Sequence, residues 1–155
     1  MSFEYISKSL EDTGKLAHEL AKHLSGGDVI LFYGGLGAGK TAFTKALAQG
    51  LDVKDHIHSP TFTLIHEHRG RLNLYHIDLY RLDTIEEIRN IGFEEYLYSD
   101  GVTVVEWSEK LGDYLPEGAI KIKAEILGDC ERKYTLSSEI EYYEKILGEV
   151  ENCLF

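Results

Sequence analysis

The sequence contains the stretch Gly34-Gly35-Leu36-Gly37-Ala38-Gly39-Lys40-Thr41, which fits the pattern G-x-x-x-x-G-K-[ST]. An unbroken run of apolar and aromatic residues, Val29 to Tyr33, leads into it and predicts a strand buried on both faces of a parallel sheet. Residues Thr41 to Leu51 follow with apolar side chains at helical spacing. Glycines between a strand and a helix let backbone N–H groups surround an anion at the positive end of the helix. The stretch therefore predicts a phosphate-binding loop.

The loop predicts specific contacts with a nucleotide. Lys40 is expected to reach the β and γ phosphates and to act in catalysis, and the Thr41 hydroxyl is expected to coordinate Mg²⁺. A phosphate loop alone indicates nucleotide binding, because hydrolysis also needs a metal ion and a water aligned for in-line attack. The expected nucleotide-binding residues of the loop and its helix are Gly34, Gly37, Ala38, Gly39, Lys40, Thr41 and Ala42.

Two acidic residues at the ends of predicted strands are candidates for the hydrolytic chemistry. Val102 to Val105 predicts a short buried strand that delivers Glu106 to the edge where open α/β sheets bind ligands, and Glu106 is paired with Thr41 on the metal side. Asp78 follows the predicted strand Leu72 to Ile77, and we expect it to orient the attacking water or to accept its proton. The alternative roles are a solvated strand-end acid for Glu106 and a turn-capping aspartate for Asp78.

Other polar and aromatic residues have two interpretations each. Ser59, Pro60 and Thr61 predict a loop, which either senses the γ-phosphate as a switch segment or is a plain connection. Trp107 either shields the site or contacts a partner, or it packs in the core. Histidines spaced by two suggest a metal site, but no third ligand type with metal-site spacing accompanies them, so metal binding is disfavoured for His56, His58, His66, His68 and His76.

Composition limits the class of protein. A length of 155 residues, with 43% hydrophobic and 28% charged residues, predicts a single globular domain, 1–155. No run approaches the roughly 18 apolar residues of a membrane span, and the first residues lack a secretory signal, so a cytoplasmic location is expected. A net charge of −11 is expected to repel nucleic acid. Cys130 and Cys153 are too few and too isolated for a disulfide framework or a thiolate zinc site.

Periodicity outlines the other elements of the chain. Ser9 is expected to cap a helix whose apolar stripe runs from Leu10 to Leu24. Asp83 or Thr84 is expected to cap a short helix further along the chain. Alternating apolar residues predict two antiparallel hairpins. The expected ranges are 62–68 with 72–77 for the first hairpin, 85–90 for the short helix, 120–126 with 134–136 for the second hairpin, and about 139–150 for an acidic C-terminal helix.

Five motifs in order resemble the bacterial TsaE family of small P-loop ATPases, which are required to make threonylcarbamoyladenosine in tRNA. The resemblance covers about residues 5 to 136 and implies an α/β, P-loop NTPase-like three-layer fold with a mostly parallel central sheet and antiparallel hairpin strands. The motifs are the phosphate loop, Ser59-Pro60-Thr61-Phe62-Thr63-Leu64, His76-Ile77-Asp78-Leu79-Tyr80-Arg81, Gly92-Phe93-Glu94-Glu95-Tyr96 and Val105-Glu106-Trp107.

The resemblance also implies a function. It implies an ATPase that uses ATP and Mg²⁺, works with a TsaB–TsaD heterodimer and meets tRNA only through those partners. By motif, Thr13 looks like a residue near the nucleotide base, and Arg132 matches a C-terminal position of the family. Gly35 departs from the family pattern, which usually has Asp there. The remaining carried-over roles agree with the residue-based assignments: Lys40 and Thr41 for phosphate and Mg²⁺, Glu106 for the metal, Asp78 for the catalytic acid, and Ser59, Pro60 and Thr61 for the switch-like segment.

Three functions remain open from the sequence. The first is an ATPase subunit of the tRNA-modifying assembly, with weak activity alone. The second is a small-molecule kinase. A kinase normally needs an arginine-rich lid, and only Arg81 and Arg89 are candidates for one. The third is a nucleotide-gated docking module without significant turnover. A GTP switch is disfavoured because the chain has no Asn-Lys-x-Asp signature.

Overall fold

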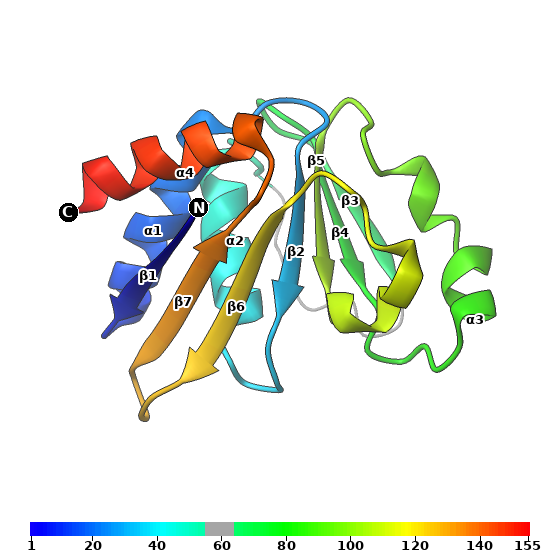
Figure 1. Ribbon diagram of the computed structural model, residues 1–155, viewed down its shortest axis with the longest axis horizontal. Helices are drawn as coiled ribbons and strands as arrows, with labels where there is room; N and C mark the ends of the chain where they lie inside the picture. The colour runs from blue at the N-terminus through cyan, green and yellow to red at the C-terminus, as the bar shows by residue number, and fades with distance from the viewer. Residues whose placement is uncertain (55–63) are drawn as a thin grey trace.

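The computed structural model describes residues 1–54 and 64–155, and within them the chain forms one seven-stranded sheet of order β1-β7-β6-β2-β5-β4-β3 (Figure 1). The four central strands, β6, β2, β5 and β4, pair in parallel. The strands at either side pair antiparallel. The strands are β1 Ser2–Ser7, β2 Val29–Tyr33, β3 Ile65–His68, β4 Leu74–Asp78, β5 Val102–Glu106, β6 Ile120–Ile126 and β7 Arg132–Ser137.

This sheet confirms the predicted α/β class with a mostly parallel centre and hairpin strands. Val29 to Phe32 are fully buried, because β2 lies between β5 and β6 and is covered on both faces. β3 and β4 form the first predicted hairpin, and β6 and β7 form the second. Alternation in these hairpins and unbroken burial in β2 are the patterns that antiparallel and central parallel strands require.

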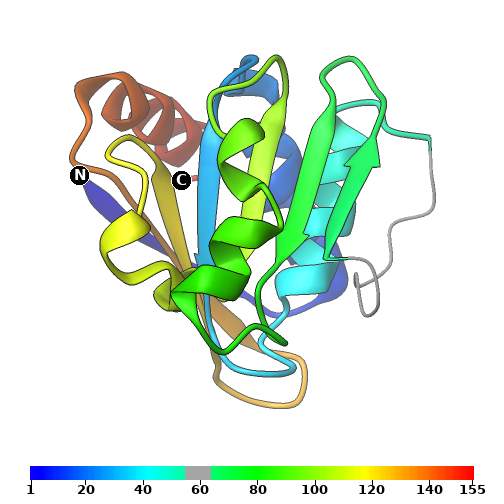
Figure 2. The same cartoon turned by 90° about the vertical axis from the view of Figure 1, so that its right-hand side faces the viewer.

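Helices cover both faces of the sheet. α1 Leu10–His23, α2 Lys40–Gly50 and α4 Glu141–Leu154 pack on one face with the larger apolar cluster. α3 Ile85–Asn90 and the 3-10 helices η1 Phe93–Glu95 and η2 Ser108–Tyr114 pack on the other. In Figure 2, α3 lies in front of the sheet, with α1 and α2 behind it. The predicted three-layer arrangement is therefore present.

The predicted helix caps are confirmed by their hydrogen bonds. Ser9 accepts a hydrogen bond from the Asp12 N–H at 3.0 Å, and Thr84 accepts one from the Glu87 N–H at 3.2 Å. Each side-chain oxygen satisfies one of the N–H groups that the first turn of a helix leaves without an intrahelical partner. Of the two expected caps for the short helix, Thr84 is the one used.

Three elements differ from the sequence-based expectation. β1 and η2 were not predicted, and the C-terminal helix spans Glu141–Leu154 rather than about 139–150. β1 exists because it pairs antiparallel with β7 along its whole length, which is a tertiary contact. Helix α4 starts later because Ser138 uses its hydroxyl for the Ala119 carbonyl and accepts the Ile140 N–H, which holds the chain extended up to the cap.

None of the helices in the described part of the chain combines the length and the apolar character that a membrane-spanning segment needs.

The packing of α4 on this fold gives a testable stability effect. Leu147 is fully buried in the larger cluster, so Leu147→Ala removes apolar contacts and leaves a cavity. We expect the free energy of unfolding, measured by urea titration, to fall by about 2–5 kcal/mol. Leu127→Ala, at a half-exposed position of the β6–β7 turn, serves as the control and is expected to change stability little. Equal stability of the two variants would contradict the packing of α4 described here.

Candidate functional site

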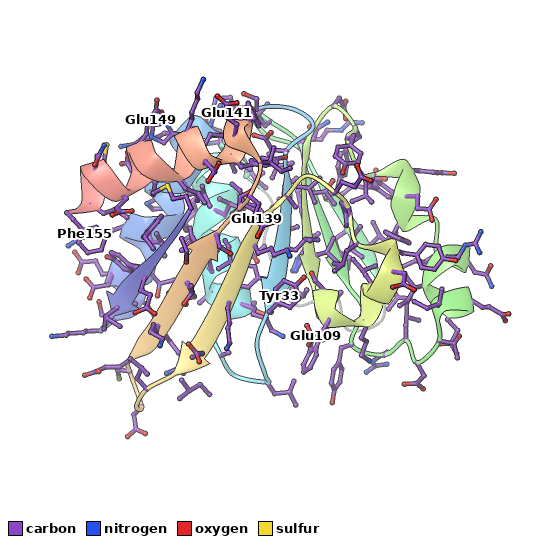
Figure 3. All side chains as sticks on the ribbon, in the orientation of Figure 1. Tyr33, Glu109, Glu139, Glu141, Glu149 and Phe155 are labelled. Carbon is purple, nitrogen blue, oxygen red and sulfur yellow. The ribbon has the colours of Figure 1, made fainter. Side chains whose placement is uncertain are left out.

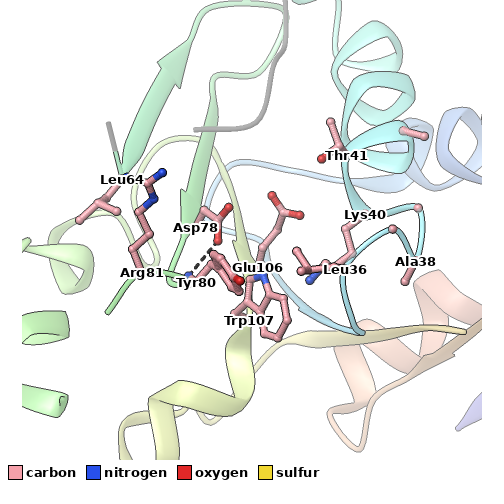
Figure 4. A pocket seen from close by; sticks show the side chains of 13 residues that line it. Leu36, Ala38, Lys40, Thr41, Leu64, Asp78, Tyr80, Arg81, Glu106 and Trp107 are labelled. Carbon is pink, nitrogen blue, oxygen red and sulfur yellow. Dashed lines mark hydrogen bonds between the residues drawn. The ribbon is translucent and has the colours of Figure 1, made fainter. Parts of the chain in front are cut away.

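The carboxyl ends of β2, β4 and β5 meet at one edge of the sheet, and a cavity of about 420 Å³ opens there. The phosphate loop forms one wall and the residues after β4 and β5 form the other (Figure 4). This is the edge at which open α/β sheets bind ligands. The predicted residues that line the cavity are Gly37, Ala38, Gly39, Lys40, Thr41, Ala42, Asp78, Glu106 and Trp107.

Two glycines of the loop have no room for a side chain. Gly34 has φ +147°, and a Cβ there would lie 2.7 Å from the Ala124 carbonyl oxygen. Gly39 has φ +103°, and a Cβ there would lie 2.5 Å from the Tyr134 hydroxyl. Both backbone conformations are ones that L side chains rarely adopt. At Gly35, by contrast, a Cβ meets no described atom within 4 Å, so space does not explain the missing family aspartate.

Lys40 is held at the mouth of the loop. Its Nζ donates a hydrogen bond to the Gly34 carbonyl at 2.7 Å and lies 3.8 Å from the centre of the Trp107 ring. Burial lowers the pKa of Lys40, and the carboxylates of Glu106, Glu109 and Asp78 oppose that shift. A cation with little water around it, facing carboxylates and a ring, is well placed to exchange these contacts for phosphate oxygens.

Trp107 lines the cavity and packs against the smaller apolar cluster, and its role as a shield of the site or a partner contact stays a prediction. Its backbone has φ +61°, a left-handed conformation that is unusual for a bulky side chain. Its ring packs against that of Tyr80 in a tilted arrangement, with centroids 5.0 Å apart and an interplanar angle of 40°. Backbone strain of this kind costs on the order of 1–3 kcal/mol and is found most often at functional sites.

Asp78 faces the loop from the end of β4, directly opposite Glu106 in the parallel register. One carboxylate oxygen accepts the Tyr80 N–H at 2.9 Å, so the turn-capping role is also present (Figure 4). Burial raises the pKa of Asp78 and the nearby Glu106 carboxylate raises it further, while the Tyr80 N–H, His76 and Lys40 act in the opposite direction. A raised pKa suits a group that must accept a proton near neutral pH.

Glu106 is buried, so the alternative of a solvated strand-end acid is wrong. Its Oε2 accepts a hydrogen bond from Nε2 of His76 at 2.5 Å, and both side chains are almost fully inaccessible to solvent. Nδ1 of His76 has no hydrogen-bond partner among the residues that the structure describes. His76 was not predicted as a site residue, because in the sequence it is one of several histidines. The missed signal is its position two residues before Asp78, which places both on one face of β4.

A second cavity, of about 680 Å³, lies on the other side of the phosphate loop. It shares Gly39 and Ala42 with the first cavity, and it contains both residues assigned by resemblance, Thr13 and Arg132. Arg132 donates a hydrogen bond to the Gly37 carbonyl at 3.2 Å. The two cavities therefore adjoin at Gly39 and Ala42.

Tyr134 connects the wall of the second cavity to the loop and was not predicted as a site residue. Its hydroxyl lies 3.4 Å from the Thr13 hydroxyl and donates to the Gly39 carbonyl at 3.4 Å. Thr13 in turn is hydrogen-bonded to Ser7 at 2.7 Å. Burial raises the pKa of Tyr134, so its hydroxyl stays protonated and available as a donor.

One predicted part of the site falls on undescribed residues. Ser59, Pro60 and Thr61, the switch-like segment, lie outside the described residues, so their role stays a prediction. The structure brings together the other predicted residues in the two cavities, except Gly34, whose carbonyl accepts the Lys40 hydrogen bond at the start of the loop.

Comparison with known proteins identifies the family. The model of the family described as "Threonylcarbamoyl adenosine biosynthesis protein TsaE" matches residues 7–134. The chain belongs to the TsaE family. The match includes both cavities and ends before α4.

Individual TsaE relatives extend over most of the chain. A tRNA threonylcarbamoyladenosine biosynthesis protein TsaE from Treponema pallidum is 42% identical over 132 residues, which are 85% of this chain and 98% of that protein. A protein of the same description from Bacillus subtilis is 39% identical over 90% of this chain and 88% of its own length. The crystal structure of Bacillus subtilis YdiB superposes with a TM-score of 0.86 at 33% identity and covers the whole of this chain.

The buried pair His76–Glu106 is expected to contribute to the stability of the folded protein. His76→Phe leaves the Glu106 carboxylate buried without its donor, and we expect the free energy of unfolding to fall by about 1–3 kcal/mol. His76→Gln keeps an N–H donor and is expected to retain part of that stability. The double variant His76→Phe with Glu106→Leu removes both polar partners and is expected to recover much of the loss. If His76→Phe is as stable as the parent chain in urea titration, the pair is not structural.

Proposed function

We propose that this TsaE-family chain is a Mg²⁺-dependent ATPase subunit that acts in the cytoplasm in the threonylcarbamoyladenosine modification of tRNA. It works with a TsaB–TsaD heterodimer and hydrolyses ATP slowly without those partners. The strongest support is the convergence of Lys40, Asp78 and Glu106 on one cavity beside the phosphate loop, because phosphoryl transfer to water needs a cation, a metal site and a base within reach of one phosphate.

The two adjoining cavities suit a nucleoside triphosphate. The loop binds the phosphates between the two cavities, and the nucleobase lies in the second cavity near Thr13 and Arg132. Lys40 leaves the Gly34 carbonyl and the Trp107 ring and contacts the β and γ phosphates. Because Lys40 already stands at the loop, binding exchanges its contacts and requires little movement of the backbone.

The donors in the first cavity fit a magnesium ion. Thr41 and Glu106 would hold it, because hydroxyl and carboxylate oxygens are the ligands that Mg²⁺ prefers. When bound, Mg²⁺ neutralises charge on the phosphate oxygens during transfer. His76 holds the Glu106 carboxylate in place, so that this ligand is oriented before the nucleotide arrives.

Asp78 is the general base in this proposal. It accepts the proton of the attacking water or orients that water towards the γ-phosphate. Its second role as acceptor of the Tyr80 N–H fixes one carboxylate oxygen, so the carboxylate cannot rotate freely away from the cavity. Burial and Glu106 both favour the protonated form of Asp78 after the transfer.

The charge of the chain supports an indirect relation to tRNA. A net charge of −11 disfavours direct binding of a polyanion, so the partners hold the tRNA. Tyr80 is 46% exposed beside Trp107 at the mouth of the first cavity. Contact of TsaB–TsaD with this aromatic pair would link partner binding to the residues that surround Lys40.

Replacement of the base tests hydrolysis. Asp78→Asn removes the proton acceptor and is expected to lower ATP turnover by about 10²–10⁴-fold with nearly unchanged ATP affinity. Turnover is measured in the steady state with and without TsaB, TsaD and tRNA, and affinity by calorimetry. Asp83→Asn, at an exposed position of the same connection, is the control and is expected to keep both. Unchanged turnover in Asp78→Asn would remove Asp78 from the mechanism.

Replacement of the loop lysine tests nucleotide binding. Lys40→Ala removes the charge that faces the β and γ phosphates, so we expect weaker ATP binding in calorimetry and loss of turnover. Parent-like affinity would contradict the phosphate-loop assignment. In the parent chain, turnover that appears only after a small metabolite is added would favour a kinase, and ATP binding without any turnover, with or without partners, would favour a docking module.

A further inference from the structure

Helices α1 and α4 bring three potential metal ligands together, away from both cavities of the site. Glu19 and His23 lie one turn apart near the end of α1, and Cys153 lies in the last turn of α4. The ligand atoms of these three side chains all lie within 4.8 Å of one another. Figure 1 shows α4 running alongside α1. This cluster, Glu19, His23 and Cys153, is called the α1–α4 cluster below.

The histidine of the cluster is oriented by an outer carboxylate. Nδ1 of His23 lies 2.9 Å from Oε2 of Glu149, a residue of α4 that is labelled in Figure 3. Its Nε2 faces Oε1 of Glu19 at 3.4 Å. When a metal-binding histidine donates one ring N–H to a carboxylate, the other ring nitrogen presents its lone pair to the metal. Glu149 therefore directs Nε2 of His23 into the cluster.

The carboxylate of the cluster is oriented as well. Lys22 donates a hydrogen bond to Oε2 of Glu19 at 2.9 Å, which leaves Oε1 on the side of His23. This hydrogen bond is the largest of the effects that lower the pKa of Glu19. The Cys153 sulfur lies within 4.8 Å of the ligand atoms of both Glu19 and His23. Two of the three ligands thus have a partner that fixes their direction.

We propose that Glu19, His23 and Cys153 bind a divalent transition metal ion of the zinc class, with water completing the coordination. A thiolate, an imidazole and a carboxylate form the mixed donor set that zinc accepts and that Mg²⁺ and Ca²⁺ do not favour. Donor atoms in a tetrahedral zinc site are separated by about 3.3–3.8 Å, so side chains within 4.8 Å need only small rotamer changes. The Cys153 proton is released to solvent when the sulfur binds the metal.

This site is independent of the proposed ATPase. The family match ends at residue 134, so Cys153 and Glu149 come from the helix outside it. Bound metal would cross-link α4 to α1 and add to the apolar contacts that hold the C-terminal helix. The small number of cysteines excludes a site made of thiolates alone. A site with one thiolate was not predicted, because Cys153 lies 130 residues from His23 and 134 residues from Glu19 in the chain.

The test uses the full chain, reduced and stripped of metal, with Zn²⁺ as the probe in calorimetry. We expect one Zn²⁺ per chain, not displaced by excess Mg²⁺, and an increase in the unfolding temperature with added Zn²⁺. Cys153→Ser and His23→Gln are each expected to weaken binding at least tenfold and to abolish the temperature increase. Glu149→Gln, which alters only the outer partner of His23, is expected to weaken binding about tenfold. Cd²⁺ should give a thiolate charge-transfer absorption that Cys153→Ser lacks.

Matched variants control for other ligands on the surface. Cys130→Ser removes the other cysteine, which lies in the second cavity, and His18→Gln removes a histidine of α1 outside the cluster. Both are expected to bind Zn²⁺ like the parent chain, and circular dichroism checks that every variant folds. Equal affinity of Cys153→Ser and the parent chain, or Zn²⁺ binding without a stoichiometric limit, would overturn the proposal. ATP turnover is not part of this test, so its result and that of the ATPase proposal are separate.

Discussion

The parallel pairing of β2, β5 and β4 is the constraint on which the site depends. The register sets Phe32 beside Glu106 and Glu106 beside Asp78, so the ends of three strands stop at one level of the sheet. The loop after β2, the buried glutamate of β5 and the aspartate of β4 are therefore neighbours, although they are far apart in the sequence. A shift of one residue in either pairing would send Glu106 or Asp78 to the opposite face.

Burial strengthens the electrostatic interactions among Lys40, Asp78 and Glu106. Lys40 loses water and gains a carbonyl, an aromatic ring and three carboxylates, while Asp78 and Glu106 lose water and approach each other. In a region of low dielectric constant, each of these charges interacts more strongly than it would at the surface. His76 offsets part of the free-energy cost of burying Glu106, because it supplies a hydrogen-bond donor to that carboxylate. The site thus offers a cation that can pair with a polyphosphate and carboxylates that can pair with a metal ion.

Elements that local sequence patterns determine were predicted from the sequence. Elements that form only because of a tertiary contact were not predicted. The loop pattern, the unbroken apolar run of β2 and the caps at Ser9 and Thr84 are local, and all were predicted correctly. β1 is a strand because β7 lies beside it, and that pairing has no local signature. The hydrogen bond of His76 with Glu106 and the contact of Tyr134 with Gly39 depend on which strands are neighbours. The resemblance supplied Thr13 and Arg132, which periodicity alone did not single out.

The contact between Gly39 and Tyr134 couples the side chains that can be accommodated at two positions far apart in the sequence. The tyrosine hydroxyl occupies the space that a side chain at position 39 would need, and it donates to the carbonyl of the same residue. A larger residue in the loop is therefore admissible only with a smaller or displaced residue on β7. Loss of the tyrosine leaves a loop carbonyl and the Thr13 hydroxyl without a shared partner. Substitutions at Gly39 in the phosphate loop and at Tyr134 in the antiparallel part of the sheet are therefore expected to have non-additive effects on stability.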